Sequence, residues 1–454
     1  MQVLLVRNGT RLAFPEVEVP CFQRIAPNLS AAVKREWGQE VLCLFPLGNV
    51  TSSKVPRGQR YYLAQAFHCR DAARQSSWVP MASLRPSAFR DSADYGTLSA
   101  CRARFSPNGG NTSGPFEKLG WFPEVTAWID KSIGPSGLRL TGTFRQLNAS
   151  AAFSLIRFET NGPAVWFKAV GEPNVHEVEI SRYLARFYPD FVPNILAVRE
   201  QWNAWLTTEA QGTHLDEHSD IETWIMVAKT LADLQIASIG HSLHLIKAGC
   251  RDVRACALID SVDPLLEAMA TLMEQQTKGS PAPLGRKELA VLGTQLKDVL
   301  SAYSNLDIRN TLGHLDFNPG NIIASQGHCV FLDWAEACVG PPFLTVQFLI
   351  ERLRRLRRAD ESWELRLLSA YSENWRSLVG NREITEALAV APLLAAFTYT
   401  ASAGTWRDAS RLNDPDIARH FRSLTRRIKH EADRWSDSAP LYPQPEALSC
   451  TFSL

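Results

Sequence analysis

The chain has 454 residues, about three times a common domain length, so two or three domains are expected. It holds 48 Lys and Arg against 47 Asp and Glu, a net charge of +1, which argues against a protein devoted to nucleic acid because phosphate binding calls for a basic excess. With 45% hydrophobic and 21% charged residues, the chain can bury a sizeable core and is not an intrinsically disordered polymer.

The nine cysteines are scattered, odd in number and form no CxxC pair, so we interpret them as reduced thiols of a cytoplasmic protein. Residues 387–406 carry no charge and are long enough to span a membrane. Pro392, Gly404 and several hydroxyl side chains dilute this stretch. We therefore predict a buried core helix, no membrane segment and no membrane partner. The sequence does not indicate an oligomeric state.

In chain order, residues 1–103 alternate short apolar runs with turns around one amphipathic helix near residues 29–37, which predicts a small α/β domain. The run FSPNGGNTSGPF cannot hold a regular element and begins a linker with a connecting helix, residues 104–136. The rest is predicted as a β-rich lobe over residues 137–210, a helical lobe over residues 211–436 and a tail over residues 437–454. The fold class is therefore α+β.

The most informative stretch is GHLDFNPGNIIASQGHCVFLDWAEACVGPP, residues 313–342, which contains His314, Asp316, Asn321 and Asp333. After Asn321, two short apolar runs separated by Ser-Gln-Gly-His predict a β-hairpin centred near Gly327. Because strands in a hairpin lie about 4.8 Å apart, Asn321 and Asp333 are expected to face one another across its open end.

This spacing indicates phosphoryl-transfer chemistry. An amide oxygen from Asn321 and a carboxylate from Asp333, held side by side, suit Mg²⁺, which takes few protein ligands and leaves room for phosphate oxygens. Asp316 can reach the same site from one side and accept the proton of an attacking hydroxyl. A buried hairpin with polar ends is the alternative, but it explains one acid rather than three converging polar groups.

HLDFNPGN followed by FLDWAEA resembles the catalytic loop and metal-binding segment of the aminoglycoside phosphotransferase and choline kinase-like family, whose members are similar in fold to protein kinases. The resemblance spans roughly residues 137–430. It implies Asp316 as the catalytic base, Asn321 and Asp333 as Mg²⁺ ligands, and His314 as a structural support of the loop. Leu315 stands where many members carry Gly, which leaves the polar positions intact.

The resemblance also implies a lysine on a small-lobe strand that holds the phosphates of ATP, and Lys168 in AVWFKAV has that position. Its expected partner on the next helix is Glu177, with Glu179 as the alternative. Glu336, in DWAEA, is expected to interact with backbone amides at a helix start, and a substrate contact is the second possibility.

Two further segments carry nucleotide contacts by resemblance. The phosphate-covering loop is expected at residues 146–150, where Asn148 and Ser150 are the candidates although there is no GxGxxG motif. WLTTEAQG, residues 205–212, resembles the linker between lobes whose backbone binds adenine, at Glu209 and Ala210. An ordinary strand end before a glycine turn is the alternative there.

Three other features carry less weight. The basic run at residues 352–358 is expected to place Leu353 and Leu356 inward and its arginines in solvent. His241 and His244 lack a third ligand, so no metal is assigned to them. The N-terminal domain resembles the Nudix hydrolase fold but lacks the adjacent glutamate pair of that family's metal box, so its metal chemistry is expected to be lost.

Together these patterns predict an ATP- and Mg²⁺-dependent phosphotransferase that acts on a hydroxyl of an unidentified small molecule. The rival is a nucleotide-binding regulator with a kinase-like body and little catalysis, which the missing glycine-rich loop favours. A hydrolase that works through the N-terminal domain is a third reading, disfavoured by the incomplete box. No nucleic-acid partner is predicted.

Overall fold

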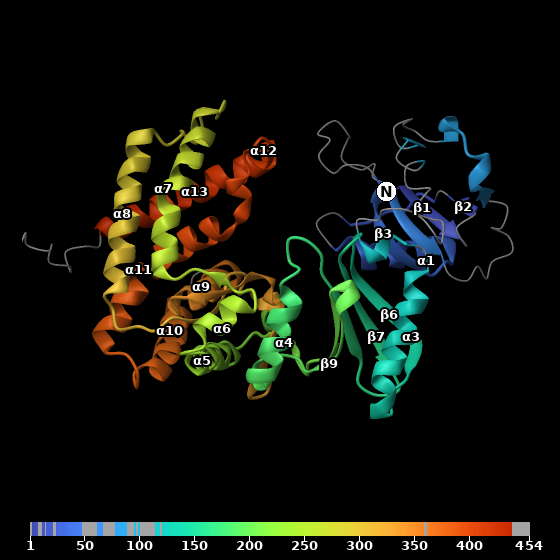
Figure 1. Cartoon of the computed structure of the whole chain (residues 1–454), viewed down its shortest axis with the longest axis horizontal. Helices are drawn as coiled ribbons and strands as arrows, with labels where there is room; N and C mark the ends of the chain where they lie inside the picture. Colours follow the sequence, from blue (N-terminus) through green and yellow to red (C-terminus); the bar gives the residue numbers. More distant parts are fainter. Residues whose placement is uncertain are drawn as a thin grey trace, which may run out of the picture. The chain divides into compact units, whose positions relative to one another are not determined.

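The computed structural model describes residues 2–7, 11–13, 15–20, 24–47, 61–66, 78–88, 95–96, 99, 114–118, 120–357 and 361–437. The chain forms two compact units (Figure 1). The first consists of Met1–Val178 and Pro193–Ala210, and the second of Glu179–Val192 and Gln211–Leu454. One division therefore falls between Ala210 and Gln211, where the sequence separates a sheet-rich from a helical lobe.

The N-terminal part of the first unit is a sheet covered by one helix. Its strand order is β3-β4-β1-β2-β5, with β1 and β4 parallel and the other neighbours antiparallel. The strands are β1 (Gln2–Arg7), β2 (Arg11–Ala13), β3 (Val41–Leu47), β4 (Tyr61–Ala66) and β5 (Val79–Pro80). Helix α1 (Ile25–Trp37) begins four residues before the predicted amphipathic helix and buries Leu29 and Val33 against this sheet.

The second sheet of the first unit is antiparallel, with the order β6-β7-β8-β10-β9. Its strands are β6 (Leu140–Ala149), β7 (Ser154–Thr160), β8 (Val165–Ala169), β9 (Ile195–Arg199) and β10 (Ala204–Thr208). Helix α3 (Trp121–Ile133) lies along this sheet in Figure 1 and buries Val125 and Ile129 in a core shared with the strands. Helix α4 (Glu177–Phe187) follows β8.

The two faces of this second sheet differ because successive side chains of a strand point to opposite sides. Ile156, Phe158 and Phe167 are buried on the face that packs with α3. The opposite face carries Lys168 and Trp205, which are paired neighbours on β8 and β10. The sheet thus holds a lysine on the face that does not pack with α3.

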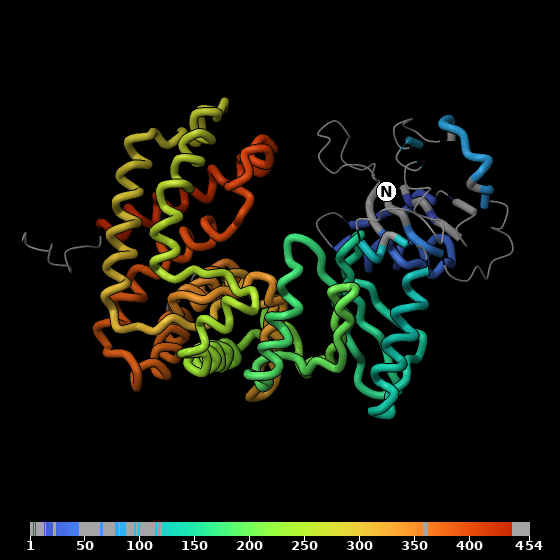
Figure 2. The backbone as a smooth tube through the Cα atoms, viewed as in Figure 1, coloured from blue at the N-terminus to red at the C-terminus, as the bar shows by residue number. Residues whose placement is uncertain are grey.

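The second unit is mostly helical. Its helices are α5 (Ile221–Ala237), α6 (Ser242–Lys247), α7 (Ala255–Glu274), α8 (Arg286–Ser304), α9 (Phe343–Arg357), α10 (Glu361–Trp375), α11 (Asn381–Ser402), α12 (Ala409–Leu412) and α13 (Pro415–Asp437). In Figure 2, α7 and α8 run side by side, and they pack their apolar residues into one core with the other helices.

Two small sheets complete the second unit. One has the order β11-β14-β15, formed by β11 (Thr213–His214), β14 (Ile322–Ser325) and β15 (His328–Phe331). The other has the order β12-β16-β13, formed by β12 (Arg251–Asp252), β16 (Ala337–Gly340) and β13 (Thr311–His314). These short strands bring the informative sequence stretch, residues 313–342, together with segments that lie far from it in the chain.

Helix α11 contains most of the uncharged stretch. It is long and apolar enough to cross a membrane by length and composition, yet 67% of its most apolar window is buried inside the protein. It packs against α9 and α13, and Leu394, Ala395 and Phe397 have no exposed surface. Burial of this kind is the pattern of a core helix, as predicted for this segment.

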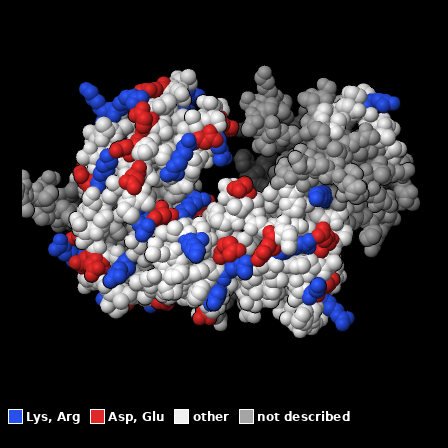
Figure 3. All heavy atoms as spheres, in the orientation of Figure 1, with Lys and Arg blue, Asp and Glu red and all other residues white. Residues whose placement is uncertain are grey.

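The α+β class and the division into a sheet-rich and a helical lobe are confirmed. One local prediction was half wrong: on α9, Leu353 is buried, but Leu356 is 50% exposed. Leu356 is the last residue but one of α9, which ends at Arg357. On the face drawn in Figure 3, Lys and Arg are interspersed with Asp and Glu over the described residues.

Several predicted features lie outside the described residues. They include most of the FSPNGGNTSGPF run, the last residues of the tail, and Cys21, Cys69, Cys101 and Cys450. The five described cysteines are free thiols, and all but Cys256 are buried. Burial raises the pKa of Cys43 to about 12, so this thiol stays protonated and packs as a small apolar group.

Candidate active site

The Asp316 carboxylate is held by two amide side chains. Asn318 donates from Nδ2 to Asp316 Oδ1 at 3.0 Å, and Asn321 donates from Nδ2 to Oδ2 at 3.3 Å. Both amides also donate to the Asp316 carbonyl oxygen, at 3.1 and 3.0 Å. Each carboxylate oxygen accepts one of these hydrogen bonds and keeps lone-pair capacity for a further proton donor. The carboxylate is therefore oriented before any substrate binds.

His314 joins the two segments of the motif. The Asp316 backbone N–H donates to His314 Nδ1 at 3.1 Å, so Nδ1 is the acceptor nitrogen and Nε2 carries the proton. Nε2 donates to the carbonyl oxygen of Leu332 at 3.1 Å. The ring is 1% exposed, and its burial lowers the pKa of His314, which favours the neutral form that this pattern requires.

The predicted hairpin is present, but its predicted register was wrong by one residue. The pairs Ile322 with Phe331 and Ser325 with His328 place a two-residue turn at Gln326–Gly327. Continuing this register, Asn321 lies opposite Leu332, and the Leu332 backbone N–H donates to the Asn321 carbonyl oxygen at 2.8 Å. A two-residue turn with Gly327 at φ 73° closes the strands tightly, whereas the prediction centred the turn on Gly327 itself, which shifts the pairing by one residue.

Asp333 therefore does not face Asn321. It follows Leu332, which is the residue opposite Asn321. Its backbone is left-handed, with φ and ψ both 63°, a conformation that is unusual outside glycine and is tolerated best by Asp and Asn. Asp333 directly follows Leu332, whose carbonyl oxygen lies 3.1 Å from His314 Nε2, and the Asp333 charge raises the pKa of His314 against the larger effect of burial. The bend thus places Asp333 beside the His314–Asp316 segment.

The donor set fits a hard cation such as Mg²⁺. The Asn321 amide points its Nδ2 at Asp316, which leaves Oδ1 directed elsewhere, and Asp333 supplies a carboxylate nearby. Among the described residues, no three His, Cys, Asp or Glu side chains gather as a metal cluster. This holds for His241 and His244 as well, and the Tyr188 hydroxyl lies beside His241 Nδ1.

Glu336 lies in a short 3-10 helix, and its carboxylate is paired with an arginine from a distant segment. It is the last residue of the short 3-10 turn Trp334–Glu336, and its carboxylate forms an ion pair with Arg251, with Nη2 and Oε1 2.8 Å apart. The Leu315 backbone N–H donates to the Glu336 carbonyl oxygen at 3.0 Å. Because β12 pairs with β16, Arg251 is brought to this turn from a distant part of the sequence.

In the first unit, Lys168 forms an ion pair with Glu177 at the start of α4. The Glu177 side chain is 1% exposed and the Lys168 side chain 18% exposed, and the Lys168 ammonium also lies 5.5 Å from the centre of the Trp205 ring. Glu179, the alternative partner, pairs with Arg182 on the surface of the helix instead. The partner of Lys168 is thus the glutamate that the sequence favours.

Asn148 and Ser150 flank the tight turn between β6 and β7. The Ser150 backbone N–H donates to the Phe153 carbonyl oxygen, and the Phe153 N–H donates to Ser150 Oγ, both at 2.9 Å. Asn148 is exposed and pairs with Leu155, whose other neighbour across the sheet is Lys168. The structure therefore places Asn148 two strands from Lys168 in the same row of the sheet.

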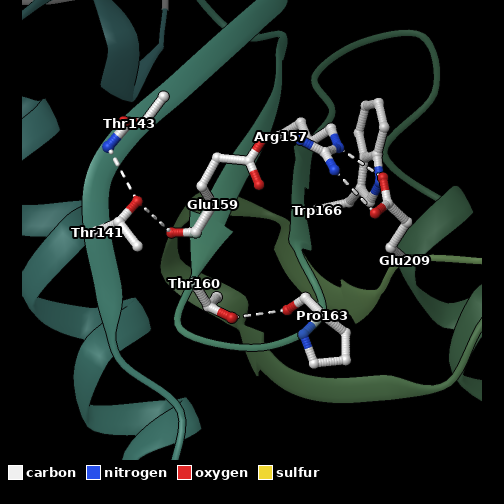
Figure 4. Close-up of polar contacts among 8 residues, drawn as sticks. All are labelled: Thr141, Thr143, Arg157, Glu159, Thr160, Pro163, Trp166 and Glu209. Carbon is white, nitrogen blue, oxygen red and sulfur yellow. Dashed lines mark hydrogen bonds and ion pairs between the residues drawn. The ribbon is translucent and has the colours of Figure 1, made fainter.

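Glu209 and Ala210 follow the end of β10. Figure 4 shows Arg157 and Trp166 directed at the Glu209 carboxylate, with Arg157 Nη2 2.9 Å and Trp166 Nε1 3.3 Å from its oxygens. Hydrogen bonding from Arg157 is the largest cause that lowers the pKa of Glu209. The Glu209 backbone N–H donates to the Ala164 carbonyl oxygen at 3.1 Å. Glu209 thus has structural partners for both its side chain and its N–H.

Sequence reasoning missed three residues that shape these sites: Asn318, Arg251 and Arg157. A signal was available for Asn318, because an Asn before Pro-Gly at a turn often bonds nearby backbone, and Asn318 Oδ1 accepts from the Gly320 N–H at 3.0 Å. Arg251 and Arg157 carry no such local signal, since their partners Glu336 and Glu209 lie far along the chain.

Residues 175–379 match the sequence model of the phosphotransferase enzyme family. The match covers slightly less than half of the chain, and this segment is similar to that family. The match includes the whole His314–Asp333 motif and confirms the resemblance to the aminoglycoside phosphotransferase type. It identifies a kinase-type enzyme that phosphorylates hydroxyl groups. Neither the Nudix-like resemblance of the N-terminal domain nor any activity there is tested by it.

Two similar solved structures have low sequence identity to this chain. A macrolide 2'-phosphotransferase, MphH from Brachybacterium faecium, is 17% identical over 65% of this chain and 98% of its own, with a TM-score of 0.43. A choline kinase from Cryptosporidium parvum is 12% identical over 70% of this chain and 97% of its own, with a TM-score of 0.48. No curated protein matches the chain.

Proposed function

We propose that the protein transfers the γ-phosphoryl group of Mg·ATP to a hydroxyl of a small molecule, with Asp316 as the general base. The observation that carries this proposal is the pair of hydrogen bonds that Asn318 and Asn321 donate to the Asp316 carboxylate. These residues lie within a segment that matches a phosphotransferase family. Such bonds orient a base toward an acceptor without protonating it, which is the requirement for deprotonating an alcohol.

In the proposed step, the acceptor oxygen attacks the γ-phosphorus while its proton passes to an Asp316 carboxylate oxygen. The bond between the γ-phosphorus and the bridging oxygen breaks, and ADP leaves with both electrons of that bond. Asn318 and Asn321 each hold one Asp316 oxygen, so the lone pair that receives the proton keeps its direction. Positioning of this kind carries most of the catalysis in phosphoryl transfer.

Asn321 Oδ1 and the Asp333 carboxylate are the proposed Mg²⁺ ligands. When bound, Mg²⁺ would neutralise negative charge on the phosphate oxygens. The left-handed backbone of Asp333 supports this assignment, because strained φ values outside glycine gather at functional sites. His314 would hold the two segments that carry Asp316 and Asp333 at a constant separation.

For ATP, we propose that Lys168 binds the phosphates and that Glu177 keeps its ammonium in place. The turn between β6 and β7 would add backbone donors, since no hydrogen bond from the Ala151 or Ala152 N–H is found within the described residues. With the Glu209 N–H bound to Ala164, the Ala210 N–H is the proposed donor to adenine, and the neighbouring Glu209 carbonyl is the proposed acceptor.

Calorimetry of ATP binding with and without Mg²⁺, followed by ATP turnover against a panel of hydroxyl compounds, tests this function. The panel should include aminoglycosides, amino alcohols and sugars. Mg²⁺-dependent binding with acceptor-stimulated turnover is the expected result. Binding with no turnover toward any acceptor would favour the regulator, and absence of ATP binding would contradict the proposal as a whole.

A further inference from the structure

A buried glutamine forms hydrogen bonds between the second sheet and the N-terminal domain. Gln146 on β6 is 4% exposed, and its Oε1 accepts from the Cys43 backbone N–H at 2.8 Å while its Nε2 donates to the Cys43 carbonyl oxygen at 2.9 Å. Within the described residues, β3 is the outer strand of its sheet, so this side-chain amide occupies the position of a neighbouring strand.

The strand that binds Gln146 is buried on both faces. Val41 and Cys43 face the core under α1, whereas Leu42 and Leu44 face the core of the second sheet together with Phe116. A strand shared in this way cannot shift by one residue without exposing apolar side chains and burying none in return. The N-terminal domain therefore offers Gln146 a rigid partner.

Directly after Gln146, strand β6 contains a bulge. Gln146 pairs with Ile156, but Asn148 pairs with Leu155, so the extra residue Leu147 interrupts the alternation of side chains. Ile156 lies on the face that packs with α3, and Leu155 lies on the face of Lys168. The bulge therefore turns Asn148 to the Lys168 face, which regular alternation after Gln146 would not allow.

The turn that follows the bulge is held from two sides. The Phe116 backbone N–H donates to the Ala151 carbonyl oxygen at 3.1 Å, and a Cβ added to Gly114 would lie 2.2 Å from that oxygen. On the other side, a Cβ added to Gly171 would lie 2.3 Å from Ala152 Cβ. Packing this close fixes the Ala151–Ala152 backbone, although the turn has no glycine of its own.

We propose that the N-terminal domain is a positioning element of the nucleotide site and that Gln146 is its positioning residue. By binding Cys43, Gln146 sets the register of the β6 bulge, and the bulge and clamped turn present Asn148 and the Ala151 and Ala152 amides to the phosphates. This inference rests on the proposed function of the turn. It gives the N-terminal domain a role in ATP affinity that requires no catalysis of its own.

The full-length protein with two matched pairs of variants tests this role. Gln146→Leu removes both bonds to Cys43 at similar volume, and Gln201→Leu, at an exposed glutamine on the same unit, is its control. Gly114→Ala forces the turn to move, and Gly134→Ala, where a Cβ would meet nothing within 4 Å, is its control. The readouts are Mg·ATP affinity by calorimetry, KM for ATP against kcat, and thermal unfolding.

We expect Gln146→Leu to weaken ATP binding about 10-fold, the size expected for two lost buried hydrogen bonds, and Gly114→Ala to weaken it about as much by displacing the turn, with kcat at saturating ATP within about 2-fold of wild type in both. Both controls should bind as wild type does. If Gln146→Leu does not fold, Gly114→Ala decides alone. Wild-type affinity in folded Gln146→Leu and Gly114→Ala would overturn this inference while leaving the proposed function intact. Wild-type protein that binds no ATP would overturn both.

Discussion

The Asp316 loop and the β6–β7 turn differ in where the residues that hold their polar groups lie along the sequence. In the loop, Asn318, Asn321 and His314 bond to Asp316 or its backbone, so nearly every support comes from residues a few positions away. In the turn, Ser150 and Phe153 bond to each other, but the remaining supports come from Cys43 and from the segment at Phe116, far away along the chain. A self-supporting loop leaves a sequence motif, and a turn held by distant packing leaves none.

This comparison predicts that variants of the two regions change different quantities, turnover in one case and nucleotide affinity in the other. Variants of Asp316 and Asn318 should lower turnover and spare nucleotide affinity, whereas variants around Lys168 and the turn should do the reverse.

The largest effect is expected for Asp316→Ala. Loss of the general base should lower turnover by about 10² to 10⁴, because a positioned base contributes that factor to proton transfer. Calorimetry should show ATP affinity unchanged, since Asp316 contacts no part of the nucleotide in the proposed step. A variant that retains full turnover would contradict the mechanism, and one that loses ATP binding would remove the distinction between loop and turn.

Lys168→Met should weaken ATP binding by about 10-fold to 100-fold, because it removes a charged donor to phosphate. It should also lower the free energy of unfolding by about 3 kcal/mol, since Glu177 is then a buried charge without its ammonium partner. Urea denaturation measures the second effect. Adding Glu177→Gln should restore part of that stability without restoring ATP affinity.

The matched control for this pair is Glu179→Gln. Glu179 is 59% exposed and pairs with Arg182 on the helix surface, so its loss should change stability by less than about 0.5 kcal/mol. An equal loss of unfolding free energy in Lys168→Met and Glu179→Gln would show that the burial of Glu177 does not determine the loss of stability.

Asp333→Asn should weaken Mg·ATP binding about 10-fold while leaving metal-free ATP binding as it is. Asn tolerates the left-handed backbone as Asp does, so the change removes the charge and keeps the bend. A Mg²⁺ titration at constant ATP measures the shift. Equal loss with and without Mg²⁺ would point to a backbone role for Asp333 rather than to a ligand.

Asn318→Ala should lower kcat about 5-fold to 10-fold, the effect of one charge-assisted hydrogen bond to the base. KM for ATP should stay within about 2-fold of wild type. A change in KM with constant kcat would show that the loop also acts on nucleotide binding, which would narrow the difference between the two regions.

The smallest effect is expected for Arg157→Met, which removes the partner of Glu209. Both side chains are partly exposed, so screening limits the loss to about 1 kcal/mol of unfolding free energy. Because Arg157 lowers the pKa of Glu209 from 4.5, the stabilisation is present above that value and is lost as pH falls through the lower folded pKa. Urea denaturation of both proteins at pH 7 and pH 3 should therefore give a smaller difference at pH 3 than at pH 7.

The parts of the fold that were predicted are those with strong local patterns. Strands β6, β7 and β8 lie in apolar-rich runs bounded by turn residues, and the helices of the second unit repeat at helical spacing, so class and lobe order could be inferred. The hairpin after Asn321 was predicted as an element, but its register was predicted wrongly, because the register depends on whether the turn is centred on Gly327 or between Gln326 and Gly327. Turn conformation is set by backbone geometry rather than by apolar pattern.

The amino-acid sequence by itself determined the chemistry of the loop: an aspartate, two amides and a histidine at spacings short enough to meet within one turn and one hairpin. Only the tertiary structure decided which side chains connect segments that lie far apart in the sequence. It pairs Arg251 with Glu336, directs Arg157 to Glu209 and seats Gln146 on Cys43. The physical reason is separation along the sequence. Hydrogen bonds between residues a few positions apart follow from their spacing in the sequence, whereas hydrogen bonds between distant segments form only once packing has brought those segments together.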